Sequence, residues 1–185
     1  SPALAKSIGD RLERLYQFAV ETTQTKDKSA SVPLMLIDEW MLSCLQEHVK
    51  AATEAMDKLM VRKAVHSALY LLDQDLQWYL RRIVTEKDSP ERRGAVTEVL
   101  KKVLDAQIRI LAPATPHLCE EIWSRTGNKG FISLTQWPLY NEKWVNVYAE
   151  ETEGLIRNII EDTSNILRAT KVTPKRICYY AAANW

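Results

Sequence analysis

The chain has 185 residues, of which 46% are hydrophobic and 26% charged, with 25 Lys and Arg against 24 Asp and Glu. This size and composition are typical of an ordinary soluble globular domain, and they exclude a disordered tail or a collagen-like fibre. The five glycines are isolated, which excludes a P-loop or a dinucleotide-binding loop, and no apolar run approaches the roughly 20 residues of a membrane-spanning helix.

Apolar residues recur every three or four positions over the first half of the chain, which is the spacing of amphipathic helices. The pattern predicts helices over 1–23, 37–59 and 61–83, with a polar loop over 24–31. Asp38 is expected to be the N-cap of the second helix, because its carboxylate can accept a hydrogen bond from a free N–H group of the first turn.

Two helix start signals follow in the second half of the chain. Ser89-Pro90 and Thr115-Pro116 each place a capping hydroxyl before a proline at the first helical position, where the missing N–H is harmless. They predict a fourth helix over 90–111 and a short helix that ends before Gly127. A last helix is expected over the apolar stripe from 155 to about 171.

The remaining segments are expected to be extended. A short alternating run over 131–138, closed by Trp137-Pro138, predicts a strap rather than a sheet, and Ile177 to Tyr180 predicts a C-terminal strand. The expected fold class is therefore all-α, an antiparallel helical bundle with a short extended strap and a C-terminal strand. The expected division is a bundle over 1–172 and a strand or linker over 173–185.

The two ends of the sequence suggest a piece of a longer protein. The Ser1-Pro2 start is not a natural one, and an apolar strand at a terminus has no partner strand after it. Residues 173–185 are expected to lead into a missing C-terminal domain.

The cysteines and histidines form no metal-binding motif. Three cysteines at wide spacing favour a reducing, cytoplasmic compartment over a disulfide framework. Cys44 with His48, and His117 with Cys119, are close enough in sequence for a metal site to be considered. No CxxC pair is present and the residues lie in apolar stretches, so buried, unreactive thiols are expected and no metal site is predicted.

The near-neutral total charge conceals an uneven distribution. Residues 31–60 carry 2 basic and 5 acidic side chains, 61–111 carry 10 and 7, and the basic residues after 167 have no acidic neighbour. Local basic patches bind phosphates even on a neutral protein. The predicted nucleic-acid contacts are Arg81, Arg82, Arg168, Lys171, Lys175 and Arg176.

The string Trp78 to Arg82 is open to two interpretations. An aromatic ring beside two guanidinium groups can stack on bases and bind phosphates. Alternatively, Tyr79 and Leu80 belong to the core stripe, and the two arginines are cations at the negative end of the third helix. By contrast, Lys101, Lys102 and Arg109 share a helix face with Glu98 and Asp105, and this spacing favours ion pairs.

Catalytic pairs are not evident in the sequence. Glu120 and Glu121 are adjacent and point in different directions on a helix, and Asp73 and Asp75 are two residues apart, so neither pair can act as an acid and base on one face. No catalytic residue is predicted.

Four segments resemble one family in order along the chain. Residues 111–123, Leu-Ala-Pro-Ala-Thr-Pro-His-Leu-Cys-Glu-Glu-Ile-Trp, resemble the LAPxTPHxxEEIW segment of the class I aminoacyl-tRNA synthetases for Leu, Ile and Val. Residues 37–43 are similar to the DxWxLS helix start of that family, Ala68-Leu69-Tyr70 precedes the Trp78 to Arg82 string, and 133–138 are similar to its S-x-x-x-W-P strap.

The string 75–82 and the tail from 160 are most similar to the archaeal and eukaryotic type of leucyl-tRNA synthetase, and the resemblance covers essentially the whole chain. Three cysteines and a moderate charge content favour a mesophilic archaeal source. The resemblance implies that most motif residues are structural, and these are Trp40, Trp78, Pro116, His117, Glu121, Trp123 and Trp137.

The resemblance implies an anticodon-binding bundle that positions leucine tRNA by backbone contacts, for ATP-dependent aminoacylation in a catalytic domain elsewhere in the parent ligase. The HIGH-type and KMSKS-type motifs and the zinc-binding insertions of the family are absent from these 185 residues. The fragment alone is therefore expected to be inactive and to hold no cofactor, while ATP and Mg²⁺ act in the parent enzyme. The implied partners are tRNA and the catalytic, editing and C-terminal domains of the parent chain, and no membrane.

Two other interpretations remain. The chain could be the same domain of a valyl-, isoleucyl- or methionyl-tRNA synthetase, which the Trp78 to Arg82 string and the tail disfavour. It could also be a helical protein-interaction scaffold without an RNA function.

Overall fold

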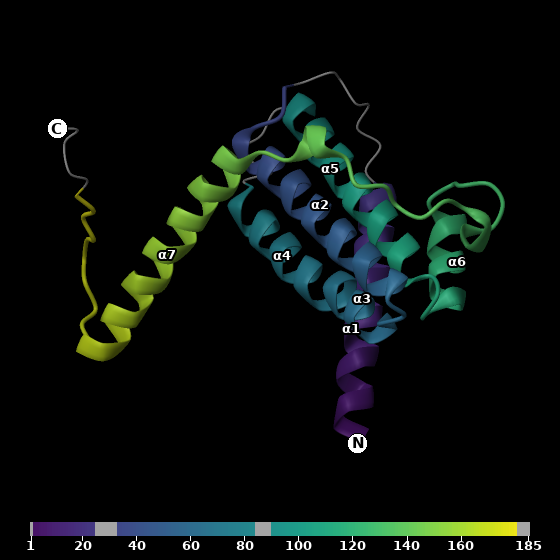
Figure 1. Cartoon of the computed structure of the whole chain (residues 1–185). Helices are drawn as coiled ribbons and strands as arrows, with labels where there is room; N and C mark the ends of the chain where they lie inside the picture. Colours follow the sequence, from purple (N-terminus) through teal and green to yellow (C-terminus); the bar gives the residue numbers. More distant parts are fainter. Residues whose placement is uncertain (1, 25–32, 84–89, 181–185) are drawn as a thin grey trace. The chain divides into compact units, whose positions relative to one another are not determined.

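The computed structural model describes residues 2–24, 33–83 and 90–180, and the chain divides into two compact units, Ser1–Glu150 and Glu151–Trp185. Within those three ranges every regular element is a helix or a helical turn, and no strand is present. Figure 1 shows the helices of the first unit packed together as a bundle. The all-α prediction is confirmed.

The helices are α1 (Pro2–Gln24), α2 (Leu36–Asp57), α3 (Val61–His66), the π-helical η1 (Ser67–Leu71), α4 (Leu72–Arg82), α5 (Pro90–Leu111), α6 (Pro116–Arg125), the short 3-10 turns η2 (Ile132–Leu134) and η3 (Glu142–Trp144), and α7 (Val147–Thr170). The bounds agree with the sequence pattern except at the last helix. That helix starts at Val147 because Asn146 caps it, with the Asn146 Oδ1 accepting the Ala149 N–H at 3.0 Å. Gln24, the first residue of the loop predicted over 24–31, is the last residue of α1. The rest of that loop and the cap Ser89 lie outside the described residues.

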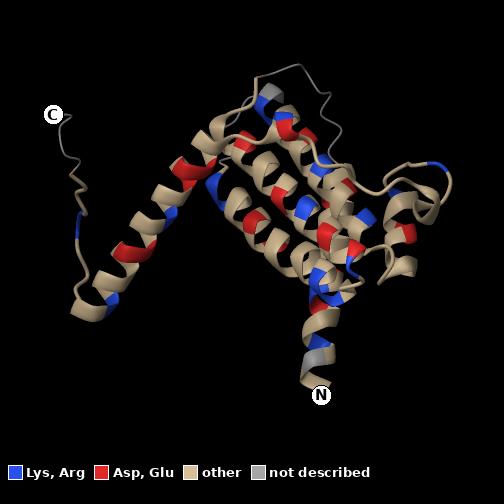
Figure 2. Cartoon of the chain, in the orientation of Figure 1, with Lys and Arg blue, Asp and Glu red and all other residues tan. Residues whose placement is uncertain are grey.

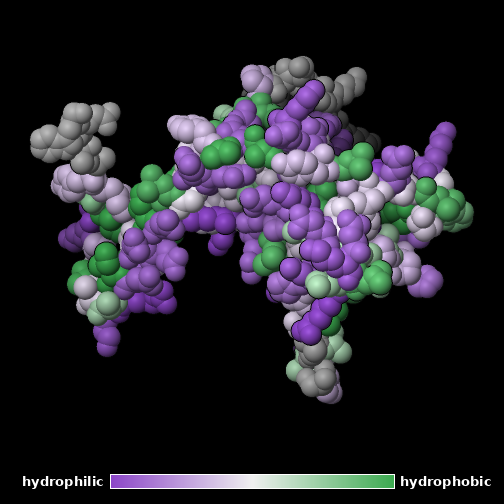
Figure 3. Space-filling view, viewed as in Figure 1, coloured by the Kyte–Doolittle hydropathy of each residue, from purple (hydrophilic) through white to green (hydrophobic). Residues whose placement is uncertain are grey.

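Helix α2 is the central element of the first unit. It packs against α3, η1, α4 and α5, while α1 packs against α5 and α6. Met41 and Leu45 of α2 and Leu104 and Ile108 of α5 are among the largest fully buried side chains, and burial of each stabilises the fold by about 1.5–3 kcal/mol. On the side drawn in Figure 3, hydrophobic residues form separate patches among hydrophilic ones. No helix in the described ranges is long and apolar enough to cross a membrane.

The structure corrects the role predicted for Asp38. The residue before α2 is Met35, so Asp38 lies in the first turn of the helix rather than at its N-cap. Its carboxylate accepts the Met35 N–H at 2.8 Å, which is the return half of a capping box.

The same carboxylate joins three helices. Asp38 is 0% exposed. Its carboxylate accepts a hydrogen bond from the Tyr79 hydroxyl of α4 at 2.6 Å. It also accepts hydrogen bonds from both terminal nitrogens of the Arg92 guanidinium of α5, and the distance from Nη2 to Oδ1 is 2.9 Å. Burial, and then the charge and hydrogen bond of Asp38, raise the pKa of Tyr79 far above its usual range, so the hydroxyl stays a donor. A bidentate pair fixes the orientation of α5 relative to α2.

The third predicted helix contains a π-helical segment that its periodicity did not predict. A π turn holds an extra residue and disturbs the regular hydrogen bonding. The Ala68 carbonyl in this segment accepts the Gln107 Nε2 of α5 at 2.8 Å. His48 of α2 contacts the Ser67 Oγ at 3.2 Å and the Asp75 Oδ2 at 2.9 Å. Side chains of α2 and α5 therefore hold the π segment on two sides.

The predicted end of α6 is confirmed, whereas the predicted C-terminal strand is not. Gly127, with φ of 82°, follows α6 as expected, and its N–H bonds the Ser124 carbonyl at 3.1 Å while Asn128 bonds the Trp123 carbonyl at 3.3 Å, which is a Schellman motif. The predicted strand over 177–180 is not confirmed, because the described residues 171–180 contain no strand. A lone strand has no neighbour to supply its hydrogen bonds.

Replacement of Asp38 by Ala is expected to lower the free energy of unfolding by about 3–5 kcal/mol, because it removes the carboxylate that compensates the buried Arg92 charge. Chemical denaturation measures the change. Asp57→Ala, at an exposed position of the same helix, is the control and should stay within about 0.5 kcal/mol. A loss below about 1 kcal/mol for Asp38→Ala would contradict this role of the carboxylate.

Candidate functional site

The basic residues predicted to bind nucleic acid divide between the two units. In the first unit, Arg81 and Arg82 lie exposed in the last turn of α4. The Arg81 guanidinium carbon lies 5.5 Å from the centre of the Trp78 ring, while Tyr79 points into the core. The core position predicted for Tyr79 is confirmed, whereas Leu80, assigned to the same stripe, is exposed. Contact of Arg81 and Arg82 with nucleic acid stays a prediction.

The second unit holds the other four residues in and after the end of α7. Arg168, Lys171, Lys175 and Arg176 are exposed, and the Arg168 Nη2 donates to the Asn165 Oδ1 at 2.6 Å. Helix α7 ends where Lys171 takes a positive φ of 52°, close to the predicted end. These residues form one exposed basic segment, which we call the α7-end segment (168–176).

Charges of both signs alternate over the helices of the first unit in Figure 2. The ion pairs predicted on α5 are confirmed: Lys101 and Lys102 reach Glu98 at 3.7 and 3.9 Å, and Arg109 reaches Asp105 at 2.9 Å. These cations are paired with carboxylates on their own helix. They are therefore weaker candidates for phosphate binding than the α7-end segment, whose sequence contains no acidic residue.

Among the motif residues named from sequence, the four tryptophans pack in or against the core, with Trp78 partly buried. Trp40 and Trp123 are 3% and 6% exposed, and Trp137 is half-buried with its Nε1 donating to the Thr53 Oγ1 at 2.8 Å. Pro116 is the first residue of α6, and the exposed side chains of His117 and Glu121 follow it. The Glu121 carboxylate accepts the Arg125 Nε at 2.6 Å on the helix surface.

The strap is held by carboxylate, amide and hydroxyl groups that the sequence analysis did not identify. Glu120 of α6 accepts the N–H groups of Ile132 at 2.9 Å and Ser133 at 3.1 Å. On α2, Gln46 accepts the Asn141 N–H at 2.8 Å and Ser43 accepts the Asn146 N–H at 2.9 Å. The positions of Ser43, Gln46 and Glu120 on predicted helices could be read from the sequence. The backbone N–H groups that these side chains bind could not, because they lie far away along the chain.

The three cysteines differ in exposure. Cys44 and Cys119 are buried, and burial raises the pKa of the Cys119 thiol to about 11, so it is uncharged at neutral pH. The burial predicted for Cys44 and Cys119 is therefore confirmed, while Cys178 is exposed in the segment after α7. In the described part of the chain, no group of three or more His, Cys, Asp or Glu residues could hold a metal ion.

The comparisons with known proteins agree with one another. Residues 38–178 match the family described as the anticodon-binding domain of tRNA ligase. The chain is 38% identical over 181 residues to a leucine–tRNA ligase of Methanosarcina barkeri, covering 97% of this chain and 18% of the relative. It is 36% identical over 176 residues to a leucine–tRNA ligase of Pyrococcus abyssi, covering 95% of this chain and 18% of the relative.

A solved structure shows the same fold. It is the ternary complex of the Agrobacterium radiobacter K84 agnB2 LeuRS with tRNA and LeuAMS, with a TM-score of 0.57 and 22% identity over 78% of this chain and 17% of that one. The chain thus spans less than a fifth of the length of these curated relatives and of this solved chain.

Replacement of Trp123 by Ala should lower the free energy of unfolding by about 3–5 kcal/mol, because a large buried ring is lost from the packing of α6. Thermal or urea unfolding measures this loss. Phe131→Ala, at an exposed position just after α6, serves as the control with little expected change. A fall below about 1 kcal/mol for Trp123→Ala would refute the structural role.

The attachment of the strap should depend on pH through Glu120. Desolvation acts to raise the pKa of Glu120, but the hydrogen bonds from the Ile132 and Ser133 backbone outweigh it, and the pKa is lowered from 4.5. A lowered folded-state pKa means that this stabilisation is present above about pH 4.5 and is lost as the pH falls through the folded-state value.

Amide hydrogen exchange at Ile132 and Ser133, compared with the intrinsic rates at each pH, measures this attachment. We expect their protection to decrease below about pH 4.5 in the wild-type chain. In Glu120→Ala it should be low at every pH, whereas Glu121→Ala should leave it unchanged. Equal protection in the wild type and Glu120→Ala would contradict the assignment.

Proposed function

The chain belongs to the family of tRNA-ligase anticodon-binding domains, and from this premise we propose that it is the tRNA-binding part of a leucine–tRNA ligase of archaeal type. The observation that supports the leucine assignment best is the 36–38% identity to archaeal leucine–tRNA ligases across at least 95% of the chain. In this proposal the chain holds leucine tRNA while ATP and Mg²⁺ act in the catalytic part of the parent enzyme, in the cytoplasm.

The proposed mode of binding is contact with the phosphate backbone. Arg81 and Arg82 form one contact surface at the end of α4, and the α7-end segment forms another. Both are exposed, and guanidinium and ammonium groups in such positions bind phosphates with release of counterions. Such contacts position an RNA without reading its sequence, which suits a domain whose task is to orient the acceptor end towards a distant site.

We further propose how the chain continues in the parent enzyme. The bundle over 1–172 would keep its long helices antiparallel, and 173–185 would become a strand or linker when the C-terminal domain follows. The exposed apolar side chains of Ile177 and Tyr179 support this proposal, because they would be covered by such a neighbour. The catalytic and editing domains of the same chain would be the other partners.

A titration of fluorescently labelled leucine tRNA against the chain, in a salt series, tests this function. We expect binding at low salt and a log-log salt slope that is clearly negative, because the contacts are with phosphates. No binding at low salt, or a flat slope, would contradict the proposal and favour a protein-interaction scaffold. Equal competition by valine tRNA would agree with backbone contacts, which carry no sequence information.

The residue assignment predicts a change of slope in charge variants. Arg81→Gln with Arg82→Gln should weaken tRNA binding and make the salt slope shallower by about 1–2, since each phosphate contact contributes about 0.7–0.9. The control pair Lys58→Gln with Lys129→Gln removes the same charge from two other exposed positions of the first unit. An equal change in both pairs would show a general charge effect and refute the assigned contacts.

A further inference from the structure

The turn between α2 and α3 exposes three apolar side chains in a row. Leu59, Met60 and Val61 are 87%, 49% and 43% exposed. Every residue of the segment 57–63 is exposed, and we call this segment the α2–α3 tip. Consecutive exposed apolar residues add little to the core of their own domain, and such a run is typical of a surface that a partner covers.

Leu59 also has a strained backbone. Its φ is 56°, in the left-handed region where glycine is the usual residue. The Leu59 N–H bonds the Met56 carbonyl at 2.9 Å and the Met60 N–H bonds the Ala55 carbonyl at 2.7 Å, which is a Schellman motif. Glycine forms this motif with less strain, and the exposed Leu59 side chain contributes little packing in return. The turn therefore gives no reason for leucine, which indicates a role for the side chain itself.

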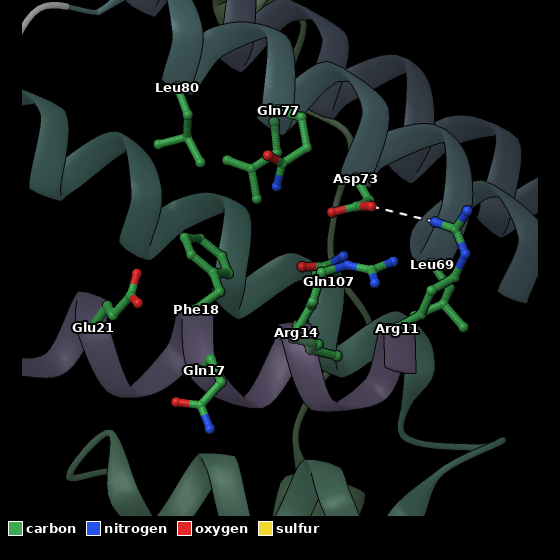
Figure 4. Close-up of a pocket in the computed structure, with 12 residues that line it drawn as sticks. Arg11, Arg14, Gln17, Phe18, Glu21, Leu69, Asp73, Gln77, Leu80 and Gln107 are labelled. Atoms are coloured by element: carbon green, nitrogen blue, oxygen red, sulfur yellow. Dashed lines mark hydrogen bonds and ion pairs between the residues drawn. The ribbon is translucent and has the colours of Figure 1, made fainter. Parts of the chain in front are cut away.

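Cations surround this apolar group. Lys58, Arg62 and Lys63 are exposed, and the tip contains one carboxylate, at its first residue. Among the residues that the structure describes, no carboxylate forms an ion pair with these three cations. Arg11 of α1, by contrast, is bound by the Asp73 carboxylate of α4 at 3.3 Å (Figure 4). An apolar surface edged by unpaired cations is complementary to an apolar socket with carboxylates at its rim.

The size of the tip restricts where such a socket lies. A stable complex of separate proteins buries about 20–30 residues on each side, whereas the tip has seven. A contact this small is sufficient when both surfaces belong to one chain, because the covalent link raises their effective concentration. The chain covers 18% of the Methanosarcina barkeri ligase, so more than four fifths of that relative lies outside the matched part.

We propose that the α2–α3 tip docks on another part of the same ligase chain, in an apolar socket with an acidic rim. Leu59 and Met60 fill the socket, and Arg62 and Lys63 pair with the carboxylates of its rim. The inference rests on the proposed function, that this chain is part of a leucine–tRNA ligase, and adds the surface that holds it against the rest of the enzyme. The aliphatic side chains offer no ring on which an RNA base stacks, which disfavours RNA at the tip.

The methionines report burial of the tip without an added label. Met60 is half exposed and Met41 is fully buried, so a soluble paramagnetic agent should broaden the methyl resonance of Met60 and spare that of Met41 in the 185-residue chain. In the full-length ligase that contains this chain, the broadening of Met60 should fall to the level of Met41. Unchanged broadening of Met60 would overturn the inference.

Added salt tests the acidic rim in the same spectra. Salt screens the attraction between the exposed cations of the tip and carboxylates, so it should restore part of the broadening of Met60 in the full-length ligase. A Met60 resonance that stays protected at every salt concentration would refute the acidic rim.

The variant Leu59→Gly separates docking from folding. In the 185-residue chain it should leave the midpoint of unfolding unchanged or raise it, because glycine relieves the left-handed turn. In the full-length ligase it should restore the broadening of Met60. Leu139→Gly removes another leucine, 79% exposed just after the strap, and as the matched control it should leave Met60 protected. A lower midpoint for Leu59→Gly in the 185-residue chain would show that leucine serves the fold and would overturn the inference.

Binding measurements on the 185-residue chain test two other occupants of the tip. Leucine tRNA should bind Leu59→Gly as it binds the wild type, since Arg81 and Arg82 end the helical run that begins at the tip. Weaker binding of tRNA by this variant would place RNA at the tip and overturn the protein socket. Binding of the wild-type chain to phosphatidylglycerol vesicles, lost in Leu59→Gly, would place a membrane there and overturn it equally.

The same data distinguish failure of this inference from failure of the proposed function. If Met60 stays exposed in the full-length ligase while the wild-type chain binds tRNA, the docking is refuted and the proposed function stands. If the wild-type chain binds no tRNA and the full-length protein forms no leucyl-tRNA, the proposed function fails, while the exposure of Met60 in the full-length protein still decides the docking.

Discussion

The buried carboxylate of Asp38 is the constraint on which the first unit depends. It connects the start of α2 to α4 through Tyr79 and to α5 through Arg92, so three helices share one ionised group away from water. Such a group is costly to bury unless its partners are in place, so packings of the helices that separate Asp38 from Arg92 are penalised. The apolar core supplies most of the stabilisation, and the ionic network orients α4 and α5.

The orientation of α4 determines which of its side chains are exposed. Tyr79, which binds Asp38, lies between Trp78 and the two exposed arginines that end the helix. The same helix gives Leu80 and Gln77 to a cavity of about 290 Å³ that α1 and α5 also line. The buried contact of Tyr79 acts together with the buried Leu72 and Leu76 to orient α4. The strap depends in a similar way on α2 and α6, whose side chains hold its backbone N–H groups.

Much of this architecture could be predicted from the sequence, for identifiable reasons. Apolar spacing and the proline start signals determined most helix bounds, because both act within one or two turns. The role of Asp38 could not be predicted, since a carboxylate near a helix start has the same local pattern whether it caps the helix or binds Tyr79 and Arg92. The π segment depends on packing between helices, which periodicity does not report. The candidate basic residues could be named from the Trp78 to Arg82 string and from unpaired charge, but their division between two units could not be predicted.

The central proposal is that tRNA contacts the exposed cations at the end of α4, a helix that Asp38 orients, and those of the α7-end segment. Hydrogen–deuterium exchange of the 185-residue chain with and without saturating leucine tRNA tests it most directly. The account predicts slower exchange at the end of α4 and over 168–176, with little change in the centres of α2 and α5, which are already buried. Unchanged exchange at both basic surfaces in the bound state, with protection confined to α6 and the strap, would contradict it.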